Sequence, residues 1–117
     1  MQVELRDDVV LLNISGWTSL FTFRKTLTIP YESIVDVAKT DYRLPLTAIR
    51  RTGIRMPHYK GGHFNTSGEK HFVSFHDENR VVVLHLQSHE FDKVVVESKN
   101  PDQLIKHLIE QTPQLNN

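Results

Sequence analysis

The chain has 117 residues, the size of one domain, and it is 38% hydrophobic and 24% charged, as is usual for a globular protein. Its 14 basic and 14 acidic residues balance, which excludes the strong positive field of a typical nucleic-acid-binding protein. The absence of cysteine excludes disulfides, thiol nucleophiles and thiolate metal sites. No apolar run approaches the roughly 20 residues that span a bilayer, and the N-terminal residues are polar, so we expect a cytoplasmic protein without a transmembrane segment or signal peptide.

Three stretches in the first third of the chain are predicted to be strands, because they are rich in β-branched residues or alternate apolar with polar side chains. The three stretches are residues 3–15, 19–29 and 34–40. The first of them is broken at Asp7-Asp8. Pro30 interrupts the ladder, since it has no N–H to donate. The residues expected to face the core are Phe21, Phe23, Leu27, Ile29, Ile34 and Val37.

Residues 41–68 are predicted to be one long loop. They contain Pro45, Pro57 and four glycines, and they show no strong periodicity. Connections of this length are usually functional or disordered, or they contain a short element of their own.

Regular structure is predicted to return as three strands in a meander, at residues 71–76, 80–86 and 91–98, with hairpin turns at 77–79 and 87–90. On the middle strand we expect Val82, Leu84 and Leu86 to face the core.

The last predicted element is a helix over residues 101–111. Asn100 is a favourable N-cap, and Pro101 suits the first helical position, where its missing N–H costs nothing. One apolar stripe is formed by Leu104, Ile105, Leu108 and Ile109. About seven strands followed by one helix predict a mainly β (α+β) domain, with a bent antiparallel sheet that the helix caps.

Two stretches resemble bacterial pleckstrin-homology-like (PH-like) proteins: LTIPYESIVDV at 27–37, and FDKVVVES at 91–98 followed by Asn-Pro-Asp at 100–102 and a helix. Residues 49–57 and 61–64 are similar to the Gly/Pro-rich loop of an uncharacterised single-domain branch of that family. The resemblance implies a single domain over 1–117, built as an antiparallel barrel of seven strands with a C-terminal helical cap. It also implies a binding platform for lipid head groups, peptides or proteins, although the basic phosphoinositide motif of eukaryotic PH domains has no counterpart here.

Charge is segregated along the chain. Residues 42–68 carry five basic and no acidic residues, so the segment is +5 and the remainder is −5. Arginine forks suit phosphate or carboxylate, and adjacent glycines allow backbone amides to approach an anion closely. The predicted ligand-binding residues are Arg50, Arg51, Arg55, Lys60, His58 and His63. The plainer interpretation is a solvated loop whose arginines pair with acids of the same domain.

The favoured function is therefore a non-catalytic binding module that recognises anionic groups or an acidic protein surface through the basic 43–63 loop. The partner would be a protein or an anionic surface, a membrane surface included, and no nucleic acid. A self-associating scaffold without a small ligand is one alternative, and a small ligand-binding or enzymatic barrel that uses His and Arg residues is another. No nucleophile motif, phosphate loop or metal-ligand spacing is present, so no catalytic residue, metal or cofactor is predicted.

Overall fold

The computed structural model describes residues 2–13, 26–39, 49–56, 59–66, 68–75 and 78–115. At residues 2, 49–56, 59–61, 66 and 78 the description is of the backbone alone. The strands within these ranges are β1 (Gln2–Leu5), β2 (Val9–Asn13), β3 (Thr26–Pro30), β4 (Ile34–Lys39), β5 (Ile49–Met56), β6 (Tyr59–Thr66), β7 (Glu69–Phe75), β8 (Val81–Leu86) and β9 (Lys93–Glu97). The helices are α2 (Pro101–Gln111) and the 3₁₀ turns η1 (Tyr31–Ser33), η2 (Glu78–Arg80) and η3 (Pro113–Leu115).

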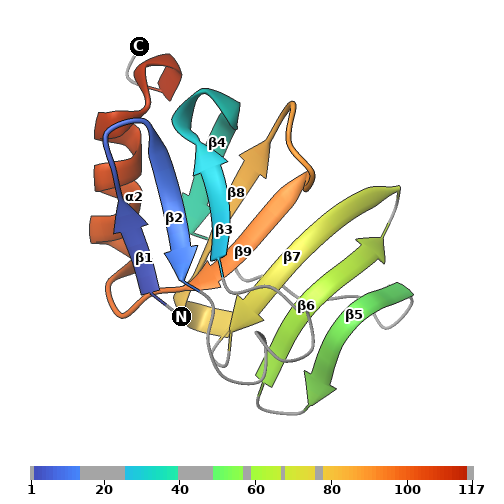
Figure 1. The fold of residues 1–117 in the computed structure, drawn as a ribbon. Coiled ribbons are helices and arrows are strands. Elements are labelled where there is room, and N and C mark those ends of the chain that lie inside the picture. Colours follow the sequence, from blue (N-terminus) through green and yellow to red (C-terminus); the bar gives the residue numbers. More distant parts are fainter. Residues whose placement is uncertain are drawn as a thin grey trace.

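These strands form two sheets (Figure 1). The small sheet has the order β1-β2-β3 and is antiparallel throughout. The large sheet has the order β4-β8-β9-β7-β6-β5, and its β7–β9 pair is parallel. The predicted mainly β fold with a C-terminal helix is confirmed. Over the residues described, no pairing joins the two sheets into a closed barrel.

The predicted meander over residues 71–98 is wrong in one respect. The β8–β9 hairpin is present, but β9 lies between β7 and β8, so the expected β7–β8 hairpin does not form. The physical reason lies in β9, whose Val94, Val95 and Val96 are all buried. A strand that is apolar on both sides is suited to the middle of a sheet that is covered on both faces.

The predicted loop over 41–68 is also wrong over much of its length, because it contains β5 and β6. Its glycines indicated a loop, yet Gly53 and Gly62 face each other as a regular ladder pair. Pairing of β6 with β7 over residues 60–66 offsets the weak strand propensity of the glycines in β6. The predicted core residues Phe21 and Phe23 lie outside the described residues.

The main core lies between the small sheet, one face of the large sheet and α2. Leu27, Ile29, Ile34 and Val37 are buried in it as predicted, together with Val82, Leu84 and Leu86 of β8. The opposite face of the large sheet carries a second buried cluster, formed by Phe64, Val73, Phe75, Val81, Val83 and Val95. The strand β8 is therefore buried on both faces, whereas the prediction from alternating residues identified only the face of Val82, Leu84 and Leu86.

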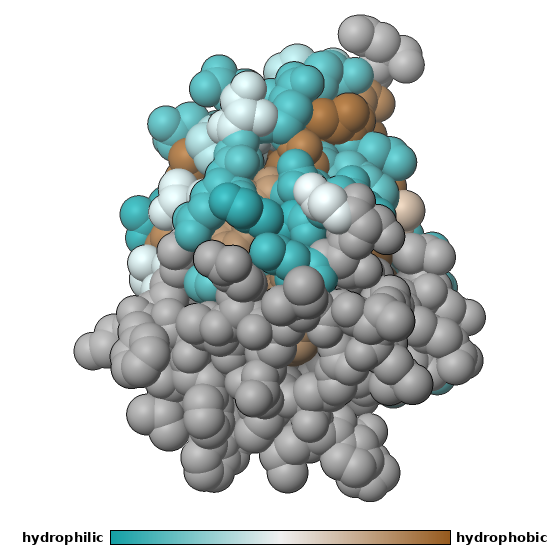
Figure 2. Space-filling model, turned by 90° about the vertical axis from the view of Figure 1, so that its right-hand side faces the viewer, coloured by the Kyte–Doolittle hydropathy of each residue, from teal (hydrophilic) through white to brown (hydrophobic). Residues whose placement is uncertain are grey.

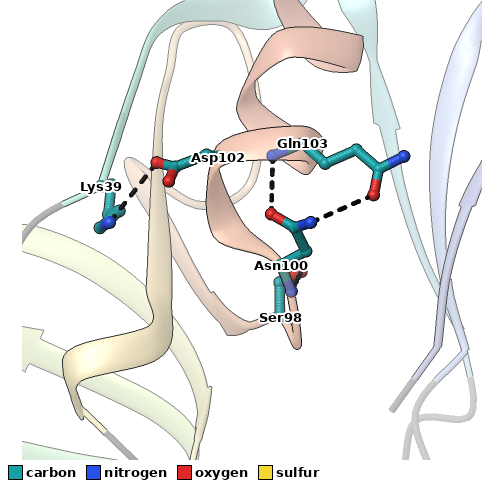
Figure 3. Close-up of polar contacts among 5 residues, drawn as sticks. All are labelled: Lys39, Ser98, Asn100, Asp102 and Gln103. Carbon is teal, nitrogen blue, oxygen red and sulfur yellow. Dashed lines mark hydrogen bonds and ion pairs between the residues drawn. The ribbon is translucent and has the colours of Figure 1, made fainter.

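The helix α2 has the predicted bounds and packs against β4 and β8. Oδ1 of Asn100 accepts a hydrogen bond from the Gln103 backbone N–H at 3.2 Å, and Nδ2 of Asn100 donates to Oε1 of Gln103 at 3.4 Å (Figure 3). The first bond caps the helix start by satisfying a main-chain N–H, and the second holds the two side chains together. Leu108 is fully buried, while Leu104 and Ile105 are partly buried against the core.

The described part of the surface in Figure 2 is mainly hydrophilic. Val35, at 48%, is the large hydrophobic side chain that stands out as exposed in the described part of the chain. None of the helices described is both long enough and apolar enough to cross a membrane.

Candidate functional site

The strands β5 and β6 form an antiparallel hairpin inside the basic segment. Five of the six predicted ligand-binding residues lie on this hairpin: Arg50, Arg51 and Arg55 in β5, and Lys60 and His63 in β6. The sixth, His58, lies outside the described residues. Because β5 is the outermost strand of the large sheet, the hairpin lies at the far side of the molecule from α2 (Figure 1).

The register divides these residues between the two faces of the sheet. Arg50 is paired with Phe64 and Arg55 with Lys60, whereas His63 is paired with Thr52. Paired residues share a face and successive residues alternate, so the positions of Arg50, Arg55 and Lys60 belong to the face of Phe64. His63 belongs to the other face, and Arg51 lies at a break in the register. The hairpin therefore gathers three basic positions on one face and separates them from His63.

The ring of His63 is held by aromatic neighbours. Its centroid lies 4.9 Å from that of Phe91, with the planes inclined by 64°, and 5.6 Å from that of Phe72. Both phenylalanines are buried. Edge-to-face packing of this kind fixes the orientation of the half-buried imidazole.

A small pocket of about 160 Å³ lies beside this ring. The described residues that line it are His63, Phe64, Asn65, Lys70, Glu90 and Phe91. The side chains of His63, Asn65 and Lys70 can donate hydrogen bonds to the oxygens of an anion, and Glu90 contributes a negative charge. A volume well below that of a typical cofactor site suits one small group, such as a carboxylate or a phosphate.

One wall of this pocket is the β8–β9 loop, which hydrogen bonds hold to two neighbouring strands. The Lys70 N–H donates to Oδ2 of Asp92, and the Asp92 N–H donates to the Lys70 carbonyl, both at 2.8 Å. The Phe91 N–H donates to Nδ1 of His89, and Nε2 of His89 lies 3.0 Å from the Thr28 carbonyl of β3. A backbone amide can only donate and a carbonyl can only accept, so this arrangement places the His89 proton on Nε2.

A polar network lies on the other face, beside Phe64. His71 is paired in register with Phe64 on one side and with Lys93 on the other. Nε2 of His71 and Nζ of Lys93 lie 3.2 and 3.3 Å from the same oxygen of Glu69. Burial lowers the pKa of His71, although the hydrogen bond that His71 donates to Glu69 opposes this effect, and that same hydrogen bond lowers the pKa of Glu69. At neutral pH the network is a carboxylate held between a neutral imidazole and an ammonium.

The sequence interpretation missed most of the pocket, because its residues come from β6, β7 and the β8–β9 loop. The end of the predicted loop over 41–68 belongs to a hairpin instead, in which Asn65 is the ladder partner of Lys70 and Gly68 has a φ of +79°. A short hairpin between residues 66 and 69 was the signal that could have placed these two side chains together. Over the residues described, no group of three or more His, Asp or Glu side chains is placed to hold a metal ion.

Comparison of the chain with protein-family models, with curated proteins and with solved structures finds no match.

Proposed function

We propose that the chain is a non-catalytic, cytoplasmic binding module that recognises carboxylates on an acidic protein surface. The binding surface is the face of the β5–β6 hairpin to which Arg50, Arg55 and Lys60 belong, and the pocket beside His63 lies on the other face of the sheet. The observation that carries the proposal is the register of the hairpin, which pairs Arg55 with Lys60 in the outer part of the large sheet. The segment that contains this pair has five basic residues and no acidic residue.

Two like charges directly opposite each other destabilise a pair of strands. An anion bound between them offsets that repulsion, so the pair is better suited to a bound state than to a free one. Charged residues on an edge strand also oppose edge-to-edge aggregation. Protection against aggregation is therefore the competing explanation for the basic residues of β5. Binding measurements separate the two roles, because only the first requires an anionic partner.

The PH-like family assignment forms part of this proposal. It is supported by the stretch 27–37, which runs through β3, η1 and β4, and by the capped helix α2. The parallel β7–β9 pair departs from an antiparallel barrel. The class of function, a binding module, is inferred by analogy with this family. The preference for anions is inferred from the basic residues of the hairpin.

The test is an NMR titration of the ¹⁵N-labelled chain with a glutamate-rich peptide at low salt. We expect signals of β5 and β6 to shift, with an affinity that falls as salt is added. A triple variant, Arg50→Ala, Arg55→Ala and Lys60→Ala, should lose the binding. A matched control, Lys39→Ala, Lys99→Ala and Lys106→Ala, removes the same charge from elsewhere and should keep it.

Equal losses in the two triple variants would show a response to net charge alone and would refute the hairpin as the site. Vesicles of phosphatidylcholine with and without phosphatidylserine form a second arm. Binding to the anionic vesicles but not to the peptide would refute a protein surface as the target.

A further inference from the structure

The strand β1 forms an edge of the small sheet beside α2. It pairs with β2 on one side, and no strand described pairs with its other side. A groove of about 490 Å³ runs along that other side. Its lining comprises Val3 and Leu5 of β1, residues 97–100, and Gln103, Leu104 and His107 of α2. The two elements that line this groove, β1 and α2, lie on the side of the molecule away from the β5–β6 hairpin (Figure 1).

The hydrogen-bond pattern indicates which main-chain groups of β1 point toward this groove. At the end of the β1–β2 hairpin the Arg6 N–H donates to the Val9 carbonyl at 2.9 Å. Bonded and non-bonded pairs alternate along an antiparallel ladder, so Glu4, which is opposite Leu11, is again a bonded residue. Val3 and Leu5 occupy the non-bonded positions between. Their N–H and C=O groups therefore point away from β2 and toward the groove.

An extended segment of another chain presents donors and acceptors with the same two-residue repeat. At the usual strand spacing of about 4.8 Å, such a segment lies between β1 and α2. Its residues opposite Val3 and Leu5 face inward, toward the partly buried side chain of Leu104. Apolar side chains suit these two positions.

In the bound segment, the residue between the two apolar residues lies directly opposite Glu4. The Glu4 side chain is 48% exposed and lies 3.4 Å from Arg6 on the same side of β1. A basic residue at that position forms an opposite-charge cross-strand pair with Glu4. We propose that the β1 edge and the α2 groove bind an extended segment of a partner protein in which a Lys or Arg stands between two apolar residues.

A second copy of the chain is the poorer occupant. Antiparallel pairing of two β1 strands through Val3 and Leu5 places two Glu4 carboxylates directly opposite each other, which is destabilising. The charge on Glu4 therefore favours a partner of different sequence.

The test uses short acetylated peptides centred on Val-Lys-Val or Val-Glu-Val, titrated into the ¹⁵N-labelled chain. We expect the lysine peptide to bind about threefold more tightly, from the usual size of a cross-strand charge pair. The Glu4→Lys variant should reverse this preference. Glu32→Lys makes the same charge change at another exposed position and should leave the preference as it is.

Hydrogen exchange supplies a second readout within the same strand. The amides of Val3 and Leu5 should become protected when peptide binds, whereas the Glu4 amide, already bonded to β2, should not change. Equal affinities of the two peptides for both proteins, or no binding of either peptide, would overturn the proposal. Protection of Val3 and Leu5 without peptide, together with a dimer in sedimentation, would identify a second copy as the occupant and would also overturn it.

Discussion

Nε2 of the buried His71 lies 3.2 Å from Oε1 of Glu69, which couples the interior of the large sheet to pH. Burial lowers the pKa of His71 from 6.5, and the hydrogen bond from His71 lowers the pKa of Glu69 from 4.5. For both groups the unfolded chain takes up its proton at a higher pH than the folded chain. The stability that they contribute is therefore complete above about pH 6.5 and is lost as the pH falls, first through His71 and then through Glu69.

We expect His71→Leu to flatten the pH dependence of stability just below about pH 6.5, because leucine keeps the site apolar and binds no proton. Urea unfolding at a series of pH values measures this. His107→Ala removes an exposed histidine from α2 and serves as the control. Parallel curves for the wild type and His71→Leu would contradict the assignment of this pH dependence to His71.

The cap of α2 gives a second prediction. Asn100→Ala removes the acceptor for the Gln103 N–H and should lower the free energy of unfolding by about 1 kcal/mol. Asn100→Asp keeps the acceptor and should retain most of the stability. Urea denaturation of the two variants measures the difference, and an equal loss in both would assign the effect to something other than the cap.

Burial on α2 gives a third prediction. Leu108 is 1% exposed, whereas its neighbour Ile109 is only half-buried. Leu108→Ala should cost about 2–5 kcal/mol, because it leaves a cavity in the main core. Ile109→Ala should cost clearly less. Thermal and urea unfolding rank the two variants, and the reverse order would mean that α2 presents another face to the sheets.

The β8–β9 loop gives a fourth prediction. His89→Ala removes the acceptor for the Phe91 N–H and the donor to the Thr28 carbonyl. We expect faster hydrogen exchange at Phe91 and a loss of about 1 kcal/mol. Gln87→Ala changes an exposed residue of the same loop and should leave the exchange at Phe91 unchanged. Unchanged exchange in His89→Ala would show that the ring does not hold the loop.

The parts of the fold that could be predicted from the sequence depend on neighbours in the chain. The bounds of α2 follow from Asn100, Pro101 and one apolar stripe, all within twelve residues. The β8–β9 hairpin follows from a polar stretch between two apolar runs. In each case the stabilising contacts join residues that are close in the chain, so the local pattern and the tertiary contacts agree.

The parts that could not be predicted depend on distant partners. Phe72 of β7 pairs in parallel with Val94 of β9. The strands β8 and β9 are both apolar, so no local pattern indicates which of them pairs with β7. The strand β6 carries two adjacent glycines and gains its order from β7. The pocket beside His63 forms only when β7 pairs with both β9 and β6, so His63 is the one residue of its lining that could be predicted as a binding residue.

The position of β9 between β7 and β8 has a consequence for synthesis on the ribosome. The two flanking strands leave the ribosome before the strand that joins them, so the large sheet stays incomplete until residues 93–97 have emerged. Until then β8, with the uncharged sequence VVVLHL, lacks its central neighbour, and such a run is prone to aggregate. Nascent chains that stop short of residue 93 therefore lack the strand that lies beside β8 in the finished sheet, and aggregation through β8 competes with folding at that stage.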